Sequence, residues 1–351
     1  MQEIIIPDDI VCQSRILDIT FSPTNDVICI GDMHGNISLY NYANLQTPQK
    51  IFSLKAHDDT TRNVKFNDQG NLLFSTSSDG SVTVTDLNAQ RVFIKNAKAH
   101  NGEIFALDVS GNIFTTGDEN GRIKIWDMRQ RKCVSQHQKH HDFISQLLIN
   151  RDTLYCAGGD GCMSTWNLKT NNVIGISDNM NTDLLSIAIA KEDERLVCGG
   201  QDGKLYVWNW NDWEYPVHKL KGHPESIEAI IPVSKNRIIT GSSDGIIRLA
   251  QIDPHQLISC IGAHDEGFSI ERLALSRDKN ILASSSHSRH VKFWDVGGIF
   301  NDNDDEIVME KPAEDIINAY QEEQLKNEYN RKRKTKGPQT RNEQNPFYAD
   351  M

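Results

Sequence analysis

The chain has 351 residues, 38% of them hydrophobic, and a formal net charge of −11 at pH 7. This composition excludes a wholly disordered chain, and no apolar stretch approaches the roughly 20 residues that a membrane-spanning helix needs. The negative charge disfavours a body that binds nucleic acid through its phosphates. The seven cysteines form no C-x-x-C pair, so we expect reduced thiols, no metal and no cofactor.

One pattern then recurs seven times along the chain: an apolar run, a turn, and a second run in which apolar and polar residues alternate. The turn positions lie about 40–45 residues apart, at Gly35, Gly80, Gly121, Gly161, Gly203, Gly245 and Arg289. Alternation is the period of a β-strand with two different faces, and Asp-Gly pairs such as Asp79-Gly80 suit tight hairpin turns. Further apolar runs upstream, such as Ile227–Val233, predict about four short strands in each repeat.

These repeats resemble the WD-repeat family at the aromatic–acid pairs Trp126-Asp127 and Trp294-Asp295 and at the histidine upstream of most hairpins. The resemblance implies an all-β fold, a seven-bladed WD-repeat β-propeller. It also implies a structural hydrogen-bond network within each blade that joins the histidine, a strand hydroxyl, the turn aspartate and the tryptophan. Three pairs are expected in this structural role: His57 with Asp79, His141 with Asp160, and His223 with Asp244.

A closed ring of blades leaves no long sheet edge exposed, so the last hairpin, ending near Val296, needs an outermost strand. The Ile-rich segment Glu3–Cys12 is the expected donor. Residues 1–296 are then one propeller domain, because stacked repeats form a single unit.

Residues 297–351 are expected to form a charged C-terminal tail, partly helical and partly disordered. It begins with an acidic linker, continues with a predicted helix over Pro312–Asn327, and ends with a basic cluster. The cluster comprises Arg331, Lys332, Arg333, Lys334 and Lys336. Such clusters are typical of nuclear targeting signals or of RNA contacts, and a merely solvated run of charge is the alternative.

No motif indicates catalysis. Gly241–Gly245 satisfies G-x-S-x-G, but it lies in a strand-to-strand hairpin rather than the strand-to-helix turn that a nucleophile needs. The histidines recur once per blade and cannot converge on one site. We therefore expect a protein that is not an enzyme.

Two surfaces are candidates for partner binding. Acidic residues precede the first strands of several blades on one face, among them Asp58, Asp59, Glu225, Asp265 and Glu266. A ring of one charge attracts ligands of the opposite charge, so this face is expected to bind a basic protein segment, such as a ribosomal-protein extension. Trp210 and Trp213 indicate a second contact site on the opposite face, unless one of them packs over the outer edge of the blade.

The segment Trp126-Asp127-Met128-Arg129 resembles the WDxR box through which some WD propellers bind the adaptor of cullin-based ubiquitin ligases. In that alternative, Trp126, Asp127 and Arg129 would form the adaptor box of a substrate receptor.

Longer stretches resemble one branch more closely, the WD repeat-containing protein 55 family of nucleolar ribosome-biogenesis factors. The matching stretches include Gly159–Leu168, Asn209–Trp213 and Glu271–Asp295. This resemblance implies a nuclear, nucleolar protein-interaction scaffold in rRNA processing. Its expected partners are pre-ribosomal assembly factors rather than membranes, and the propeller is expected to be a monomer within a larger complex.

Overall fold

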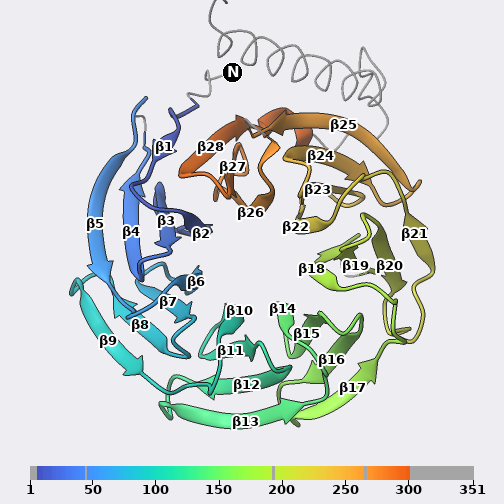
Figure 1. The fold of residues 1–351 in the computed structure, drawn as a ribbon, viewed down its shortest axis with the longest axis horizontal. Helices are drawn as coiled ribbons and strands as arrows, with labels where there is room; N and C mark the ends of the chain where they lie inside the picture. The colour runs from blue at the N-terminus through green and yellow to red at the C-terminus, as the bar shows by residue number, and fades with distance from the viewer. Residues whose placement is uncertain (1–5, 44–45, 192–193, 265–266, 301–351) are drawn as a thin grey trace, which may run out of the picture. The chain divides into compact units, whose positions relative to one another are not determined.

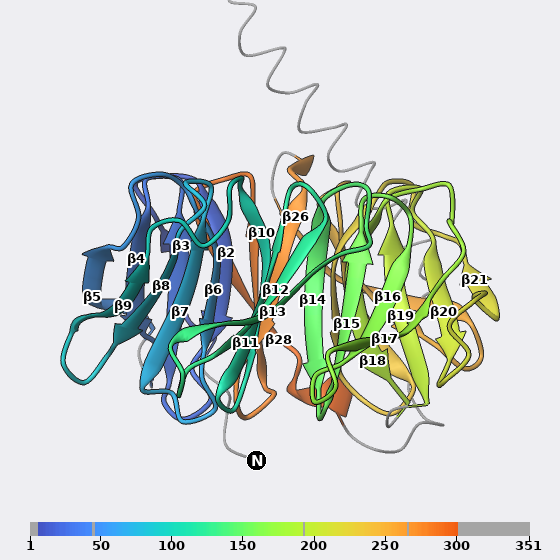
Figure 2. The same ribbon diagram turned by 90° about the horizontal axis from the view of Figure 1, so that it is seen from below.

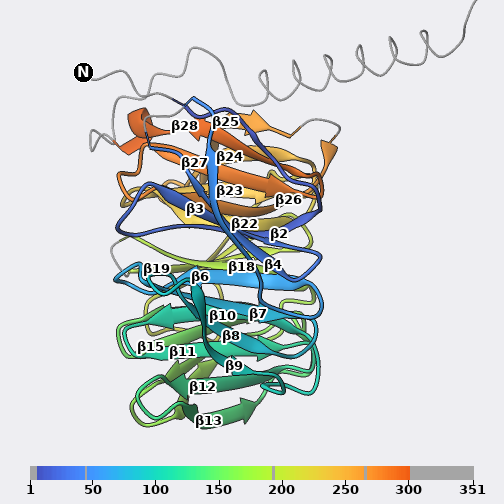
Figure 3. The same ribbon diagram turned by 90° about the vertical axis from the view of Figure 1, so that its left-hand side faces the viewer.

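The computed structural model describes residues 6–43, 46–191, 194–264 and 267–300. Within these ranges, 28 β-strands form seven four-stranded antiparallel sheets. The sheets stand as blades around a central axis, as seen down the axis in Figure 1 and from two sides in Figures 2 and 3. The predicted all-β, seven-bladed propeller is therefore confirmed.

Six blades each take four consecutive strands, ordered from the inner to the outer edge (Figure 1). Blade 1 comprises β2 (Ile16–Phe21), β3 (Val27–Asp32), β4 (Asn36–Asn41) and β5 (Gln49–Lys55). Blade 2 comprises β6 (Thr61–Phe66), β7 (Leu72–Ser77), β8 (Val82–Asp86) and β9 (Arg91–Asn96). Blade 3 comprises β10 (Ile104–Ser110), β11 (Ile113–Asp118), β12 (Arg122–Asp127) and β13 (Lys132–Gln138).

The next three blades continue in the same order. Blade 4 comprises β14 (Ile144–Asn150), β15 (Thr153–Gly158), β16 (Met163–Asn167) and β17 (Asn172–Ile176). Blade 5 comprises β18 (Leu184–Ala190), β19 (Arg195–Gly200), β20 (Leu205–Asn209) and β21 (His218–Leu220). Blade 6 comprises β22 (Ile227–Pro232), β23 (Arg237–Ser242), β24 (Ile246–Gln251) and β25 (Gln256–Ala263).

Blade 7 joins the two ends of the propeller. Its strands are β26 (Ile270–Leu275), β27 (Ile281–Ser286), β28 (His290–Asp295) and, outermost, β1 (Ile10–Val11). In β1, Ile10 pairs with Val291 and Val11 with His290. The prediction that the N-terminal segment closes the ring is confirmed, and among the described residues its strand is Ile10–Val11.

The hairpin turns show why glycine recurs at the repeat positions. Gly35 has a φ of +80°, and a Cβ there would lie 2.3 Å from the backbone oxygen of His57 in the next blade. Both the backbone conformation and the close approach therefore exclude a side chain. The seventh turn has Arg289 instead, and the Ser288 hydroxyl there accepts a hydrogen bond from the His290 N–H.

Each blade buries its faces against its neighbours, so the core lies between blades. One such cluster joins Phe74 and Val84 of blade 2 to Ile104, Phe114 and Trp126 of blade 3. Because each interface needs two blades, no single repeat could be stable alone.

A short 3₁₀ helix, η2 (Gly297–Phe300), follows the last blade, and Ile299 packs against the core of blades 6 and 7. The described structure thus continues a few residues beyond the expected boundary at 296. The tail helix and the basic cluster of Arg331–Lys336 lie outside the described residues and stay predictions. All seven cysteines carry free thiols.

Candidate interaction surfaces

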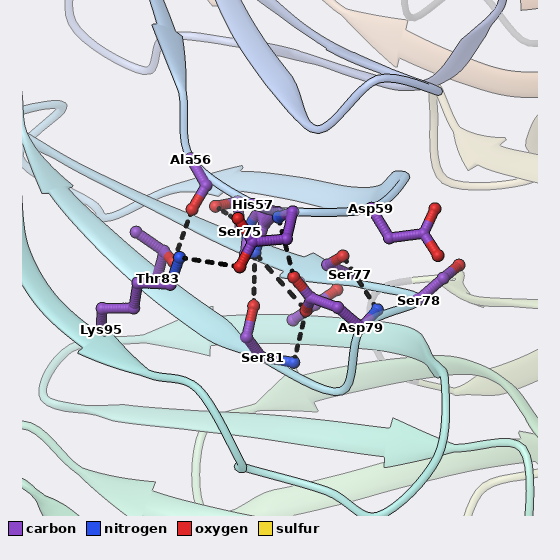
Figure 4. Close-up of polar contacts among 12 residues, drawn as sticks. Ala56, His57, Asp59, Ser75, Ser77, Ser78, Asp79, Ser81, Thr83 and Lys95 are labelled. Atoms are coloured by element: carbon purple, nitrogen blue, oxygen red, sulfur yellow. Dashed lines mark hydrogen bonds and ion pairs between the residues drawn. The ribbon is translucent and has the colours of Figure 1, made fainter.

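A buried hydrogen-bond network ties the hairpin of blade 2 to the loop before it (Figure 4). His57 is buried, with its Nε2 2.7 Å from Ser75 Oγ and its Nδ1 2.6 Å from Ser81 Oγ. Asp79 lies 4.0 Å from His57 Nδ1 and accepts hydrogen bonds from the N–H groups of Asp58 and Ser81. Burial would raise the pKa of Asp79, but hydrogen bonds from Ser81 and Asp58 hold it below its usual value. His57 and Asp79 therefore lie in one structural network.

In blade 4, the prediction chose the wrong member of the His140-His141 pair. His140 is the buried histidine, with its Nδ1 3.0 Å from Asp160 Oδ1 and its Nε2 2.7 Å from Ser164 Oγ. His141 is exposed, and only its backbone N–H donates to Asp160. Adjacent residues in an extended segment project to opposite sides, so only one of the two can enter the blade.

In blade 6, the expected contact between His223 and Asp244 does not form. The Asp244 carboxylate instead accepts hydrogen bonds of 3.0 and 2.6 Å from the buried guanidinium of Arg248. His223 Nε2 lies 2.8 Å from Thr240 Oγ1, while its Nδ1 has no hydrogen-bond partner. Burial, reinforced by the charge of Arg248, lowers the pKa of His223 to about 4. This histidine is therefore neutral near pH 7.

Blade 3 holds a complete network that the sequence analysis missed. His100 Nδ1 lies 2.8 Å from Asp118 Oδ2 and its Nε2 2.7 Å from Thr116 Oγ1, which also accepts from Trp126 Nε1. Asp118 lies three residues before the turn glycine, whereas the prediction considered acids directly before that glycine. An acid three residues before the turn glycine was the sequence signal that could have identified this network.

The two tryptophans of the loop after β20, Trp210 and Trp213, differ in exposure. Trp213 is only 7% exposed, and its ring lies 5.5 Å from Trp210 and 5.7 Å from Tyr155. It also covers Gly175 of β17, where a Cβ would meet the indole at 2.9 Å. Trp213 thus packs over the outer junction of blades 4 and 5, which is the alternative considered above, while Trp210 is partly exposed beside it.

The segment that resembles the adaptor box places only its arginine in solvent. Trp126 is buried and stacked on Phe114 at 5.6 Å. Asp127 is also buried and accepts hydrogen bonds from the guanidinium of Arg129, which is 67% exposed. Those hydrogen bonds hold the pKa of Asp127 well below its usual value. The guanidinium is thus held at the surface, next to the turn between β12 and β13.

The loops that lead into the first strand of each blade, here called the leading loops, share a face with the hairpin turns. The N–H groups of Ala56 and His57, for example, donate to Gly35 O in the turn of blade 1. On this face Asp58, with its side chain 87% exposed, lies 3.7 Å from Lys95. Asp59 and Glu225 are exposed as well. Asp265 and Glu266 lie outside the described residues.

Acids of two further leading loops act on each other. The pKa of Asp183 is raised, first by burial and then by the nearby carboxylate of Asp142. By contrast, the turn aspartates Asp79, Asp160 and Asp244 are engaged in hydrogen bonds within their own blades. The carboxylates of these three turn aspartates are therefore less available to a partner than those of the leading loops.

The inner strands surround a central cavity of about 570 Å³. Two buried carboxylates on the inner strands were missed by the sequence analysis, and one of them, Asp18, lines this cavity. Asp18 Oδ2 accepts a 2.7 Å hydrogen bond from the Val64 N–H in the next blade, and Asp108 Oδ2 accepts one of 2.6 Å from the Ile149 N–H. These contacts link blades, which makes both carboxylates structural.

Among the described residues, no group of three or more His, Cys, Asp or Glu side chains is placed to hold a metal ion. No helix in that part of the chain is long and apolar enough to cross a membrane.

Comparison with known proteins gives a consistent picture. The sequence model of the WDR55 family matches residues 7–299. The chain is 36% identical over 299 residues to the WD repeat-containing protein 55 homolog of Dictyostelium discoideum, covering 85% of this chain and 72% of the relative. It is 34% identical over 284 residues to WD repeat-containing protein 55 of Arabidopsis thaliana, covering 79% of each chain. The human protein of that name is 31% identical over 294 residues, covering 83% of this chain and 76% of the relative.

Proposed function

The chain belongs to the WD repeat-containing protein 55 family, and on that premise we propose that it is a non-enzymatic scaffold for protein assembly in the nucleolus, acting in rRNA processing and ribosome biogenesis. Its leading-loop face binds basic segments of ribosomal proteins or of assembly factors. Its basic tail cluster, Arg331–Lys336, directs it to the nucleus.

The exposed carboxylates of the leading loops carry this proposal. Asp58 has its side chain 87% exposed, and Asp59 and Glu225 are exposed on the same face. The raised pKa of Asp183 reflects burial and repulsion from Asp142, and a partner's cation nearby would relieve that repulsion. A face with this charge repels phosphates, so a basic protein segment suits it better than RNA.

The test compares two pairs of charge reversals in the full-length protein. Asp58→Lys with Glu225→Lys changes the leading-loop face, while Asp212→Lys with Glu214→Lys places the same charge change on the exposed loop between β20 and β21. Tagged wild-type protein is expected to recover pre-ribosomal particles, less so as salt rises. The first pair abolishes recovery and the second leaves it intact, with melting temperatures confirming that both fold.

Normal recovery by the leading-loop variant would contradict the assignment of this face. Recovery of complexes without ribosomal proteins or assembly factors would contradict the proposed process.

Replacing Arg331, Lys332, Arg333 and Lys334 by Ala is expected to leave a fluorescent fusion in the cytoplasm, and nuclear retention would contradict the role of the cluster.

A receptor for a cullin-based ubiquitin ligase is the second candidate, and the exposed guanidinium of Arg129 favours it. An adaptor that binds this segment needs that charge, so Arg129→Ala would abolish adaptor recovery. If no adaptor is recovered with the wild-type protein, this candidate fails.

A further inference from the structure

A small apolar pocket opens at the outer side of the junction between blades 2 and 3. Its volume is about 40 Å³. Blade 2 contributes Val84, Ile94 and Asn96 to its wall, and blade 3 contributes Trp126 and Met128. The volume exceeds the 10–15 Å³ or so that one water molecule needs and is far below the roughly 150 Å³ of a cavity that binds benzene. The pocket therefore has room for the end of one aliphatic side chain.

The register of the outer strands explains why this junction is open. In blade 3, His137 pairs with Ile123, and its ring lies 4.4 Å from Trp166 of blade 4, which it covers. At the same register position in blade 2, Asn96 pairs with Val82. The shorter Asn96 side chain leaves part of the Trp126 surface uncovered, which forms the pocket.

The rim of the pocket is positively charged in a protein with a net charge of −11. Arg131 and Lys132 line the opening, and both are exposed. The Arg131 guanidinium lies 5.1 Å from the centre of the Phe93 ring, which is 45% exposed. The one acid in the wall, Asp127, is neutralised by Arg129. Nothing in the wall therefore offsets the charge of Arg131 and Lys132.

We propose that this pocket binds an acidic segment of a partner protein. One Leu, Ile, Val or Met side chain enters the apolar pocket, and carboxylates beside it pair with Arg131 and Lys132. The apolar wall favours a peptide over RNA, because phosphates would use the cations and leave the pocket empty. The site is separate from the leading-loop face, and its occupant has the opposite charge.

The test begins with selection from a random peptide display library on the immobilised full-length protein. One group of enriched peptides is expected to carry one aliphatic residue flanked by Asp or Glu, apart from any basic peptides that the leading-loop face binds. A labelled synthetic copy of the strongest peptide then reports affinity by fluorescence anisotropy, with a copy that has Ser in place of the aliphatic residue and a single-stranded RNA as comparisons.

Two variants address the two parts of the site. Asn96→His supplies the ring that closes the next junction, and Arg131→Glu with Lys132→Glu reverses the rim. Each is expected to weaken peptide binding about tenfold or more. The matched control, Lys139→Glu with Lys221→Glu, reverses two exposed lysines elsewhere and is expected to leave the affinity unchanged. Thermal melting confirms that each variant folds. If Asn96→His does not fold, the variant with Arg131→Glu and Lys132→Glu still tests the proposal.

Three results would overturn the proposal. The first is a selection that enriches no acidic peptide with an aliphatic residue. The second is equal binding of the peptide to the rim-reversed and control proteins. The third is displacement of the peptide by RNA with equal binding of the Ser copy. The last result would assign Arg131 and Lys132 to phosphates instead.

Discussion

At the scale of single residues, the same contact of a buried histidine recurs in five of the blades. The Nε2 atoms of His57, His100, His140, His223 and His264 each lie within hydrogen-bond distance of a strand hydroxyl, at 2.7 or 2.8 Å. The partner of Nδ1 differs between blades. An aspartate fills that place in blades 3 and 4, and Ser81 does so in blade 2. The contact of Nε2 with a hydroxyl is therefore shared by these blades, while the partner of Nδ1 varies.

We predict that stability falls between pH 6.5 and pH 5 because His57 and His223 stay neutral in the fold. Burial lowers the pKa of His57 to about 4, against the opposing charge of Asp79. The unfolded chain binds a proton near pH 6.5 and the folded chain only near pH 4, so the stability is full above pH 6.5 and is lost as the pH falls. Each such histidine costs about 1.4 kcal/mol per pH unit, or about 2 kcal/mol down to pH 5.

Urea unfolding of the wild-type protein and of His57→Gln at pH 7 and pH 5 measures this effect. The variant is less stable at pH 7 but loses less stability on acidification. His34→Gln, at an exposed position, is the control and keeps the wild-type dependence. An unchanged pH dependence in His57→Gln would contradict the prediction.

A second prediction concerns Arg248, which pairs with the turn aspartate of blade 6, Asp244. In blade 4 the corresponding aspartate, Asp160, contacts the buried histidine instead. In Arg248→Ser, the Asp244 carboxylate remains while the nearby cation is gone, so the pKa of His223 should rise above about 4. Serine is the replacement because blade 4 has a serine, Ser164, at the strand position that Arg248 occupies in blade 6. Histidine ring NMR signals followed against pH report the shift. Arg277→Ser, which removes a surface ion pair with Asp26, should leave His223 unchanged.

At the scale of elements, the ring closes through a strand of only two residues. Ile10 in β1 is 4% exposed and packs in the cluster that joins blades 7 and 1, whereas Val11 is 64% exposed. Backbone pairing with β28 continues past the strand through the Cys12 N–H, which donates to Arg289 O. The strand's anchoring side chain is therefore Ile10.

Shortening the side chain of Ile10 should weaken the closure of the ring. Ile10→Ala is expected to cost about 2 kcal/mol or more, seen as a lower melting temperature and as faster amide exchange in β28. Val11→Ala removes a similar side chain from the same strand without removing buried contacts, so it should cost less than about 0.5 kcal/mol. Equal effects of the two changes would show that the side chain of Ile10 does not hold the closure.

At the scale of the whole molecule, two buried carboxylates each connect three successive blades. Asp18 in blade 1 accepts from the Val64 N–H of blade 2 and lies 3.4 Å from Arg272 Nε of blade 7. Asp108 in blade 3 accepts from the Ile149 N–H of blade 4 and lies 3.0 Å from Lys65 Nζ of blade 2. These bridges between inner strands couple neighbouring blades into a cooperative unit.

Removing one bridge should destabilise the entire propeller. Asp108→Ala leaves a buried backbone N–H without its acceptor and is expected to cost about 2 kcal/mol in a single unfolding transition. Asp108→Asn keeps an acceptor oxygen and should cost less. Asp152→Ala, which breaks the exposed pair with Lys169, should change stability little. If Asp108→Ala matched Asp152→Ala, the bridge would not contribute to the ring.

The sequence alone determined the number of blades, the hairpin in each repeat and the origin of the closing strand, because these depend on local periodicity and on turn residues such as Asp79-Gly80. Which side chains contact one another depends instead on three-dimensional packing, and only the tertiary structure decided it. His140 rather than His141 enters its blade, Arg248 captures Asp244, and Trp213 is buried because β17 offers Gly175 beside it. Asp18 and Asp108 likewise bridge blades whose strands are about 40 residues apart in the chain. The bridges of Asp18 and Asp108 leave no local pattern, since their partners lie in different repeats.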